Sequence, residues 1–102
     1  MEPEIIPAYE YFFVFWHYKD NELRNGKRCG TICQLLAGDD VVTQGEAVLR
    51  PDERYDPVIG RQVALSRALQ AYPDETAGLF WQIYYDHYGA KEYQRYMDFM
   101  KV

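Results

Sequence analysis

The stretch AYEYFFVFWHYK, residues 8–19, decides how this chain folds. It is dense in aromatic and β-branched residues and has neither Gly nor Pro, which is typical of a β-strand. Alternate residues of a strand point to opposite faces. Both sets are apolar here: Tyr9, Tyr11, Phe13 and Phe15 on one face, and Phe12, Val14, Trp16 and Tyr18 on the other. Since neither face is polar, both faces of the sheet need cover.

Two more strands are expected downstream. Residues 29–38 (CGTICQLLAG) form the second and residues 41–50 (VVTQGEAVLR) the third, with a turn around Gly38-Asp39-Asp40. Short polar connections would join the three strands into an antiparallel meander. Asn25-Gly26 favours a tight hairpin turn, but such a turn leaves the start of the first strand beyond the end of the second. Either the connection is a wider loop, or the start of the first strand pairs elsewhere.

Helical patterns follow the third strand. Asp56-Pro57 indicates a helix start, because Asp caps free amides and Pro suits the first helical position. This helix runs to Pro73, which ends it. Its polar side is expected to face solvent: Arg61, Gln62, Arg67 and Gln70. Two further helices, at about 76–88 and 90–101, are separated by Gly89, a natural C-terminal cap.

The pattern therefore predicts an α+β fold of the order β-β-β-α-α-α, a three-stranded antiparallel sheet followed by two to three helices packed on one face. A length of 102 residues is typical of one domain, so residues 1–102 are expected to form a single α+β domain. Pro3 and Pro7 predict that residues 1–7 are an irregular lead-in.

The second helix is apolar around most of its circumference, and Gln82 and Asp86 form its one clear polar stripe. Such a helix must be covered from more than one direction. It either lies between the sheet and the C-terminal helix, or uses one flank as an interface.

Aromatic residues are numerous, with 10 Tyr, 5 Phe and 2 Trp in the chain. Tyrosine combines an apolar ring with a polar hydroxyl, so it suits interfaces as well as half-buried core. A monomer of three strands and three helices cannot bury all these rings. We therefore expect part of the aromatic surface to contact a partner.

The net charge is −5, and Lys and Arg residues do not cluster. Proteins that bind the phosphate backbone draw affinity from clustered bases, so direct nucleic-acid binding is not expected. The acidic residues are scattered among bases rather than grouped in runs, which speaks against mimicry of nucleic acid without excluding it.

No metal, cofactor or catalytic site is expected. Cys29, Cys33, His17 and His87 could be imagined as zinc ligands, but their spacing matches no paired-ligand pattern. Two cysteines are too few for a disulfide framework and fit a reducing cytoplasm. No set of residues supplies a nucleophile, a base and an orienting group together, so the chain is not predicted to be an enzyme.

The N-terminal MEPEIIPAYE is acidic and holds two prolines, unlike a signal peptide. No apolar run approaches the roughly 20 residues that a membrane helix needs. We therefore expect a soluble intracellular protein with no membrane partner.

The residues predicted to bind a partner are three aromatic anchors and two bases. Binding energy concentrates in a few buried Trp and Tyr side chains, which favours Trp16, Trp81 and Tyr85. Arg61 and Arg67 lie on the first helix, where they either solvate it or recognise an acidic partner.

Residues 45–70, GEAVLRPDERYDPVIGRQVALSRALQ, resemble small proteins encoded by bacteriophages and other mobile elements. In those proteins a short strand leads through a P-x-D-x-x loop into a helix of the type hydrophobic-G-R-x-x-A-L-x-R-A-L. The matching residues are Gly45, Ala47, Pro51, Asp52, Tyr55, Ile59, Gly60, Arg61, Ala64, Leu65, Arg67, Ala68 and Leu69. The resemblance implies a virus or mobile element in a bacterial cytoplasm, and it carries over no active site.

The leading hypothesis is a noncatalytic phage accessory protein that acts by protein–protein binding on a host protein or protein–nucleic-acid complex. Small proteins of such origin often disable host machines, CRISPR nucleases included, so an anti-CRISPR-like inhibitor of a bacterial defence complex is expected by analogy. One alternative is a self-assembling homodimer closed by the aromatic strand. Another is a nucleic-acid-binding module that stacks bases on an aromatic sheet face and uses Arg61 and Arg67.

Overall fold

An antiparallel sheet and three helices make up residues 3–20, 28–48 and 56–101, the part of the chain that the computed structural model describes. The strands are β1 (Glu4–Ala8), β2 (Tyr11–Asp20), β3 (Arg28–Ala37) and β4 (Asp40–Val48). The helices are α1 (Pro57–Ala68), which continues into the short 3-10 helix Leu69–Ala71, α2 (Asp74–Tyr88) and α3 (Ala90–Met100). The predicted α+β class and the predicted sheet followed by three helices are confirmed, but the sheet has four strands instead of three.

The extra strand is β1, so the prediction that residues 1–7 form an irregular lead-in is wrong for residues 4–7. β1 pairs antiparallel with β2 and lies at the edge of the sheet, whose order is β1-β2-β3-β4. A proline cannot donate to a strand ladder but is tolerated on an edge strand, which is where Pro7 lies. Tyr9 and Glu10 form the turn to β2, and Tyr9 adopts a φ of 60° without any Gly or Asn to mark the turn in the sequence.

The register of β2 and β3 decides between the two alternatives for their connection. Tyr11 lies opposite Ala37 and Asp20 opposite Arg28, so the two strands pair over their whole length and residues 21–27 connect them. A wider loop is therefore correct, and Asn25-Gly26 lies outside the described residues. Because β1 pairs along its other side, β2 is an interior strand and not the edge strand of a three-stranded meander.

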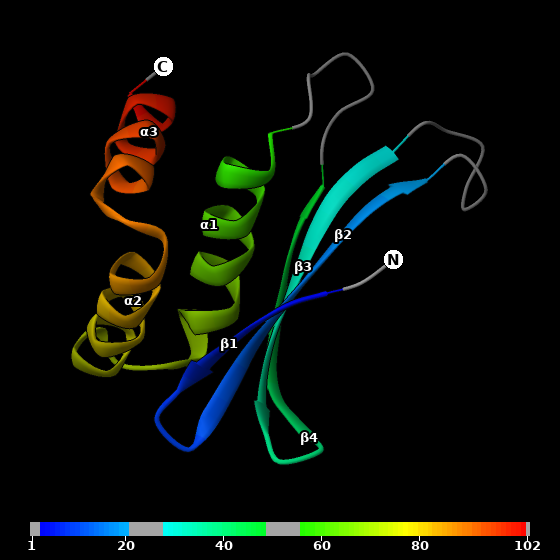
Figure 1. The fold of residues 1–102 in the computed structure, drawn as a ribbon, viewed down its shortest axis with the longest axis vertical. Helices are drawn as coiled ribbons and strands as arrows, with labels where there is room; N and C mark the ends of the chain where they lie inside the picture. The colour runs from blue at the N-terminus through cyan, green and yellow to red at the C-terminus, as the bar shows by residue number, and fades with distance from the viewer. Residues whose placement is uncertain (1–2, 21–27, 49–55, 102) are drawn as a thin grey trace.

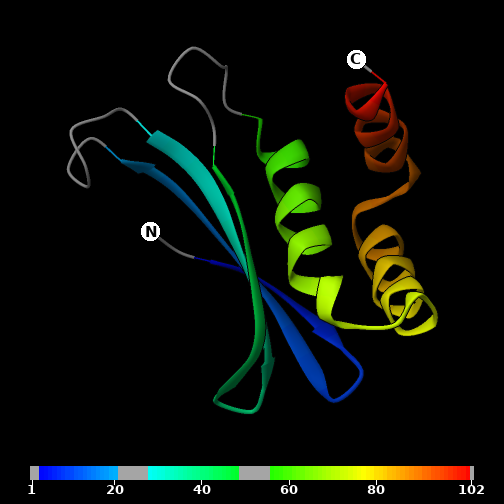
Figure 2. The same ribbon diagram turned by 180° about the vertical axis from the view of Figure 1, so that it is seen from behind.

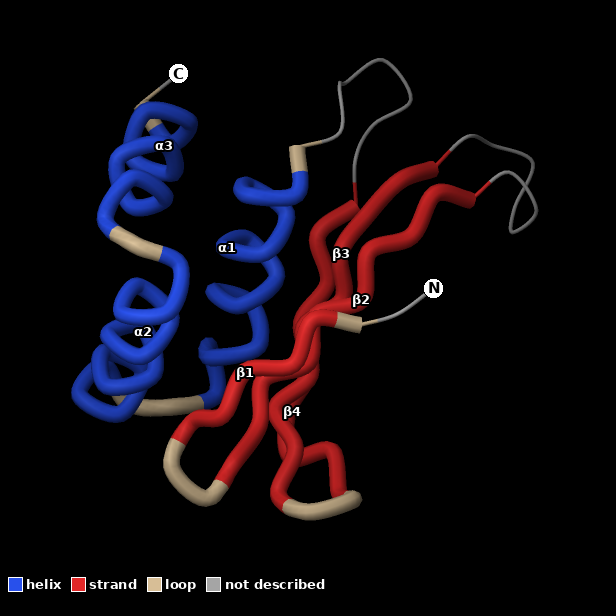
Figure 3. The backbone as a smooth tube through the Cα atoms, viewed as in Figure 1, coloured by secondary structure: helices blue, strands red, loops and turns tan. Residues whose placement is uncertain are grey.

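The helices all lie on one side of the sheet, and its other side carries none (Figure 1 and Figure 2). Figure 3 separates the two layers by colour. α1 packs on β3 and β4, and α3 packs on α1 and α2. α2 reaches the sheet through ring contacts, with Phe80 against Phe13 at 5.5 Å and Tyr84 against Phe15 at 5.9 Å between centroids. Most of the buried core on the sheet side is apolar: Ile6, Ala8, Phe13, Phe15, Cys33 and Leu35. The fully buried Thr31 lies on the same face of β3 as the last two of these residues.

The helix ends follow the sequence signals. The Asp56 carboxylate accepts a hydrogen bond of 3.0 Å from the Val58 amide, which confirms the predicted cap ahead of Pro57. Gly89 has a φ of 98° and donates its amide to the Tyr85 carbonyl, ending α2 as predicted.

The backbone of α1 approaches β4 most closely at Gly45. A Cβ atom there would lie 2.3 Å from both the Ala64 carbonyl oxygen and the Ala68 amide nitrogen. Beside this contact, the Thr43 hydroxyl donates a 2.7 Å hydrogen bond to the Ala68 carbonyl. Only glycine lets the helix lie this close to the strand.

The predicted polar side of α1 does not face solvent throughout. Arg61 and Gln62 are buried, which corrects the expectation for these two residues. The reason is that α3 packs on the side of α1 that faces away from the sheet. α1 therefore lies between two layers, and its polar residues there need partners instead of water.

Candidate protein-binding surface

The sheet face opposite the helices carries several exposed apolar side chains. The register of the strands places alternate residues of each strand on it. We call these residues the open face: Ile5, Pro7, Phe12, Val14, Trp16, Tyr18, Ile32, Gln34, Leu36, Val41, Gln44, Glu46 and Val48.

Large apolar side chains of the open face remain exposed. Ile5 keeps 58% of its surface, Phe12 42%, Trp16 37% and Val48 46%. Phe13 and Phe15, which alternate with them along β2, are fully buried under the helices. The expectation that this chain has more apolar rings than its core can bury is therefore confirmed for the single chain. A contiguous exposed apolar patch on a soluble protein is typical of an interaction site.

The polar groups of the open face are already paired with one another. Trp16 Nε1 donates to Gln34 Oε1 at 3.0 Å, and Gln34 Nε2 donates to Gln44 Oε1 at 2.9 Å. The Tyr18 hydroxyl donates to a Glu46 carboxylate oxygen at 2.5 Å. A partner that covers this face need not supply hydrogen bonds for these groups, so its contact surface can be apolar.

Tyr18 reaches Glu46 across the strand between them. Gly30 of β3 lies opposite Tyr18, and a Cβ atom at Gly30 would lie 2.5 Å from the Tyr18 hydroxyl oxygen. The missing side chain therefore leaves room for the Tyr18 ring to lie over β3, which flattens this end of the open face.

Both edges of the sheet are poor sites for the addition of another strand. β1 is short and contains Pro7, which has no amide to donate. At the other edge, Arg67 Nη1 donates to the main-chain carbonyl of Glu46 on β4 at 2.6 Å. A strand added there would compete with this guanidinium. Neither edge of the sheet is therefore suited to the addition of another strand.

A second aromatic group lies between α2 and α3. The Trp81 ring stacks on Tyr85 at 5.5 Å and on Tyr96 at 6.1 Å between centroids. Tyr93 meets the edge of Tyr85 at 5.4 Å. Trp81 and Tyr85 are only partly exposed and hold α3 against α2. α2 is therefore covered by the sheet on one side and by α3 on another, while Leu79 of α2 is exposed, so an interface on one flank of the second helix stays a prediction.

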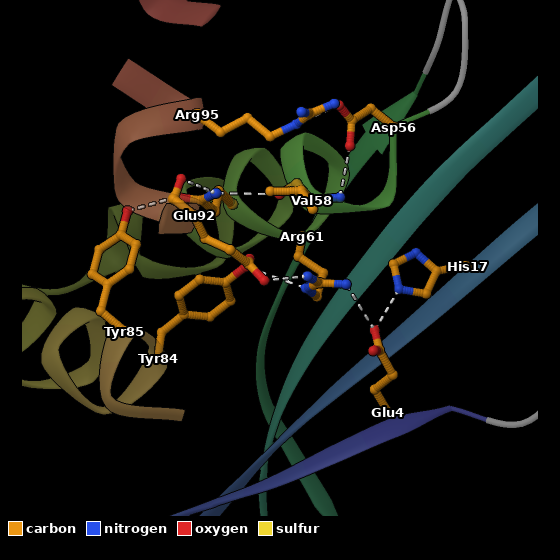
Figure 4. A network of polar contacts seen from close by, with 10 residues as sticks. Glu4, His17, Asp56, Val58, Arg61, Tyr84, Tyr85, Glu92 and Arg95 are labelled. Carbon is orange, nitrogen blue, oxygen red and sulfur yellow. Dashed lines mark hydrogen bonds and ion pairs between the residues drawn. The ribbon is translucent and has the colours of Figure 1, made fainter. Parts of the chain in front are cut away.

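A network of polar contacts centres on Arg61 (Figure 4). Its guanidinium binds Glu92 of α3 at 2.7 Å, Glu4 of β1 at 3.4 Å and the Tyr84 hydroxyl at 3.2 Å. The guanidinium carbon also lies 4.1 Å from the centre of the Tyr88 ring. Burial works against the charged form, but the hydrogen bond with Tyr84 and the surrounding negative charge outweigh it and raise the pKa of Arg61. This arginine joins the sheet to α2 and α3.

The same region contains the neighbour of Arg61 on α1. Gln62 accepts a 2.6 Å hydrogen bond from the Tyr85 hydroxyl and donates one of 3.0 Å to the Glu92 carbonyl. Arg95 of α3 binds the carboxylate of Asp56, the residue that caps α1. Burial raises the pKa of Tyr85 to about 12. These contacts supply hydrogen-bond partners for Arg61 and Gln62, the two polar residues of α1 that are buried.

One set of hydrogen bonds resembles a hydroxyl–histidine–carboxylate triad in its order: it runs from Thr31 through His17 to Glu4. His17 Nδ1 lies 2.9 Å from Thr31 Oγ1, and His17 Nε2 lies 2.6 Å from a Glu4 oxygen. Thr31 has no exposed surface, so a substrate cannot reach its hydroxyl. Burial likewise raises the pKa of the Cys33 thiol to about 12, so that Cys33 stays protonated near neutral pH and is a poor nucleophile. Neither group is arranged for nucleophilic catalysis.

The five residues predicted to bind a partner lie in different places. Trp16 lies on the open face, whereas Trp81 and Tyr85 lie between α2 and α3, and Arg61 is buried. Arg67 is exposed and binds the edge strand. The structure therefore does not bring them together into one site. The sequence analysis missed Ile5 and Val48 of the open face, although the lack of polar alternation in β2 indicated that face.

Residues 3–20, 28–48 and 56–101 contain no group of three His, Cys, Asp or Glu side chains arranged as metal ligands. None of the described helices combines the length and apolar character needed to cross a bilayer. Comparison of the chain with protein-family models, with curated proteins and with solved structures gives no match. The surface itself is therefore the starting point for a functional proposal.

Proposed function

We propose that this chain is a small noncatalytic accessory protein of a bacteriophage or mobile element, which binds a host protein or protein–nucleic-acid complex through its open face. The observation that carries the proposal is the exposed, internally hydrogen-bonded apolar face of the sheet. The resemblance of residues 45–70 supports the phage origin and a bacterial cytoplasmic location. By analogy with small proteins of that origin, the target class is a bacterial defence complex such as a CRISPR nuclease.

The charge of the open face favours a protein partner over nucleic acid. Of its side chains that the structure describes, only Glu46 is charged, and it is acidic. A binder of single strands combines stacking rings with Lys or Arg that follow the phosphates. The open face offers Phe12 and Trp16 as rings but no described base beside them.

Phe12 and Trp16 are the expected anchors. They lie on the same face of the interior strand β2, four residues apart, with Val14 between them on that face. Large aromatic side chains near the centre of an interface supply most of its binding energy. Replacing Trp16 by Ala is expected to weaken target binding by about 30-fold, the effect of losing about 2 kcal/mol.

A phage challenge tests the function. The chain is expressed in a bacterium whose CRISPR defence blocks a phage, and plaques are counted. We expect the chain to restore plaque formation and the double variant Phe12→Ser/Trp16→Ser to lose this effect. Leu79→Ser is the matched control, because Leu79 is a similarly exposed apolar residue on α2, away from the open face. The same effect with the double variant, or no restoration against any defence system tested, contradicts the proposal.

A further inference from the structure

We propose that, without its target, the chain closes its open face with a second copy of itself, so that two sheets pack face to face in an isologous homodimer. The inference rests on the proposed function in one respect: target and second copy use the same face and therefore compete. The homodimer is then the resting form and the monomer is the form that binds the target.

The open face is large enough for a weak, reversible interface between two copies. Its four strands, spaced about 4.8 Å apart with about eight residues each at about 3.4 Å, span roughly 15–19 Å by 27 Å. This projected area is on the order of 450 Å², compared with roughly 800 Å² per partner in a standard interface. Two copies packed through this area would bury on the order of 900 Å² in total, including the exposed surface of Ile5, Phe12, Trp16 and Val48, which is the size of a weak, reversible dimer.

The polar pattern of the open face makes it complementary to itself. An isologous interface places the same patch of both copies in contact, so any unmatched donor would be left unmatched twice. The side chains of Trp16, Gln34 and Gln44 form a chain of hydrogen bonds within one copy. Two such faces can therefore meet without leaving the Trp16 indole N–H or the Gln34 carbonyl oxygen unpaired, and the Gln44 amide group lies on the edge strand β4.

No described charged side chain lies at the centre of the open face, so repulsion between the two copies does not oppose the dimer there. Glu46 lies on the edge strand β4 and its carboxylate already accepts the Tyr18 hydroxyl. Phe12 and Val14 lie on the interior strand β2. Aligned sheets pack about 10 Å apart at roughly 30°, with apolar side chains between them. The acidic groups of the two copies then lie at the margin of the interface, where water screens them.

The blocked edges explain why such an association stops at two copies. Pro7 on β1 and the Arg67 contact with β4 disfavour the addition of further strands. Face-to-face packing about a two-fold axis consumes the open face of each copy. The assembly is therefore closed, and no continuous sheet or fibre is expected.

Light scattering after size exclusion tests the inference on the purified chain, loaded at about 1 to 100 µM, which spans the dissociation constants of typical weak dimers. We expect twice the mass of the chain at the highest load. Phe12→Glu places a charge at the centre of the interface in both copies and should weaken dimerisation by about 100-fold or more. The control Leu79→Glu, with the same change of charge on α2, should dimerise as the natural chain does.

Circular dichroism confirms that each variant is folded, and Trp16→Glu, on the same interior strand β2, replaces Phe12→Glu if the latter is not folded. A monomer at every load overturns the inference, and so does a dimer that Leu79→Glu weakens as much as Phe12→Glu. A monomer leaves the proposed function intact, because the phage challenge reads binding to the host target alone. A dimer combined with failure of the phage challenge overturns the proposed function and keeps the homodimer.

Discussion

Replacing Gly45 by Ala is expected to lower the free energy of unfolding by about 3 kcal/mol or more. The new Cβ would lie 2.3 Å from the Ala64 carbonyl oxygen and the Ala68 amide nitrogen, and 2.8 Å from the Arg67 carbonyl carbon. All three are main-chain atoms of α1 and its end, so no side chain can rotate away. The helix as a whole must move off β4, which opens the packing of Leu65 over the sheet.

Urea unfolding followed by far-UV circular dichroism measures this effect. The matched control is Gly78→Ala on α2, where a Cβ would meet nothing within 4 Å. Gly78 is exposed within a helix, so alanine there is expected to stabilise the protein by about 0.5–1 kcal/mol. The account of the α1–β4 contact is contradicted if Gly45→Ala is as stable as the natural chain.

Replacing Arg61 by Met is expected to lower the free energy of unfolding by about 3–5 kcal/mol, the usual effect of breaking a buried ion pair from one side. The Glu92 side chain keeps only 14% of its surface in contact with solvent and would lose its cation. The Tyr84 hydroxyl would keep Glu92 as its acceptor but lose the guanidinium at 3.2 Å. Methionine fills similar volume, so the effect reports the lost charge pairing more than a cavity.

A double variant separates the charge from the packing. Arg61→Met/Glu92→Gln removes both buried charges, and we expect it to recover at least about 1–2 kcal/mol relative to Arg61→Met alone. Arg61→Lys should not restore the natural stability, since the single nitrogen of an ammonium cannot take the places of the three separate guanidinium nitrogens that bind Tyr84, Glu4 and Glu92. Equal stability of Arg61→Met and the natural chain would show that the network does not join the sheet to α2 and α3.

Local signals predicted most of the fold. Aromatic and β-branched content and the turn residues between the strands located β2, β3 and β4, and Asp56, Pro73 and Gly89 located the helix ends within a few residues. β1 was missed because two prolines in seven residues argue against regular structure, whereas an edge strand tolerates them. Its turn at Tyr9 carries no glycine or asparagine, so no local signal separates β1 from β2.

The candidate site was predicted in part. Properties that depend on neighbouring residues in the sequence were predictable, whereas contacts between residues far apart in the sequence were not. The apolar character of both faces of β2 is a local property, so the exposure of Trp16 followed from it. The burial of Arg61 did not, because its partners Glu4 and Glu92 lie 57 and 31 residues away in the sequence. A charged residue on a helix is usually solvated, and only the packing of α3 on α1 changes that expectation.

The central claim is that another protein surface covers the open face inside the cell. A photo-crosslinking analogue of phenylalanine, placed at Phe12 in one strain and at Leu79 in another, tests it most directly. Both positions are exposed to a similar degree in the single chain, 42% and 50%, so they differ chiefly in the face they occupy. After irradiation we expect discrete protein adducts from position 12, either a second copy or a host protein, and none of these from position 79. No adduct at position 12, or the same adducts from both positions, would contradict the claim.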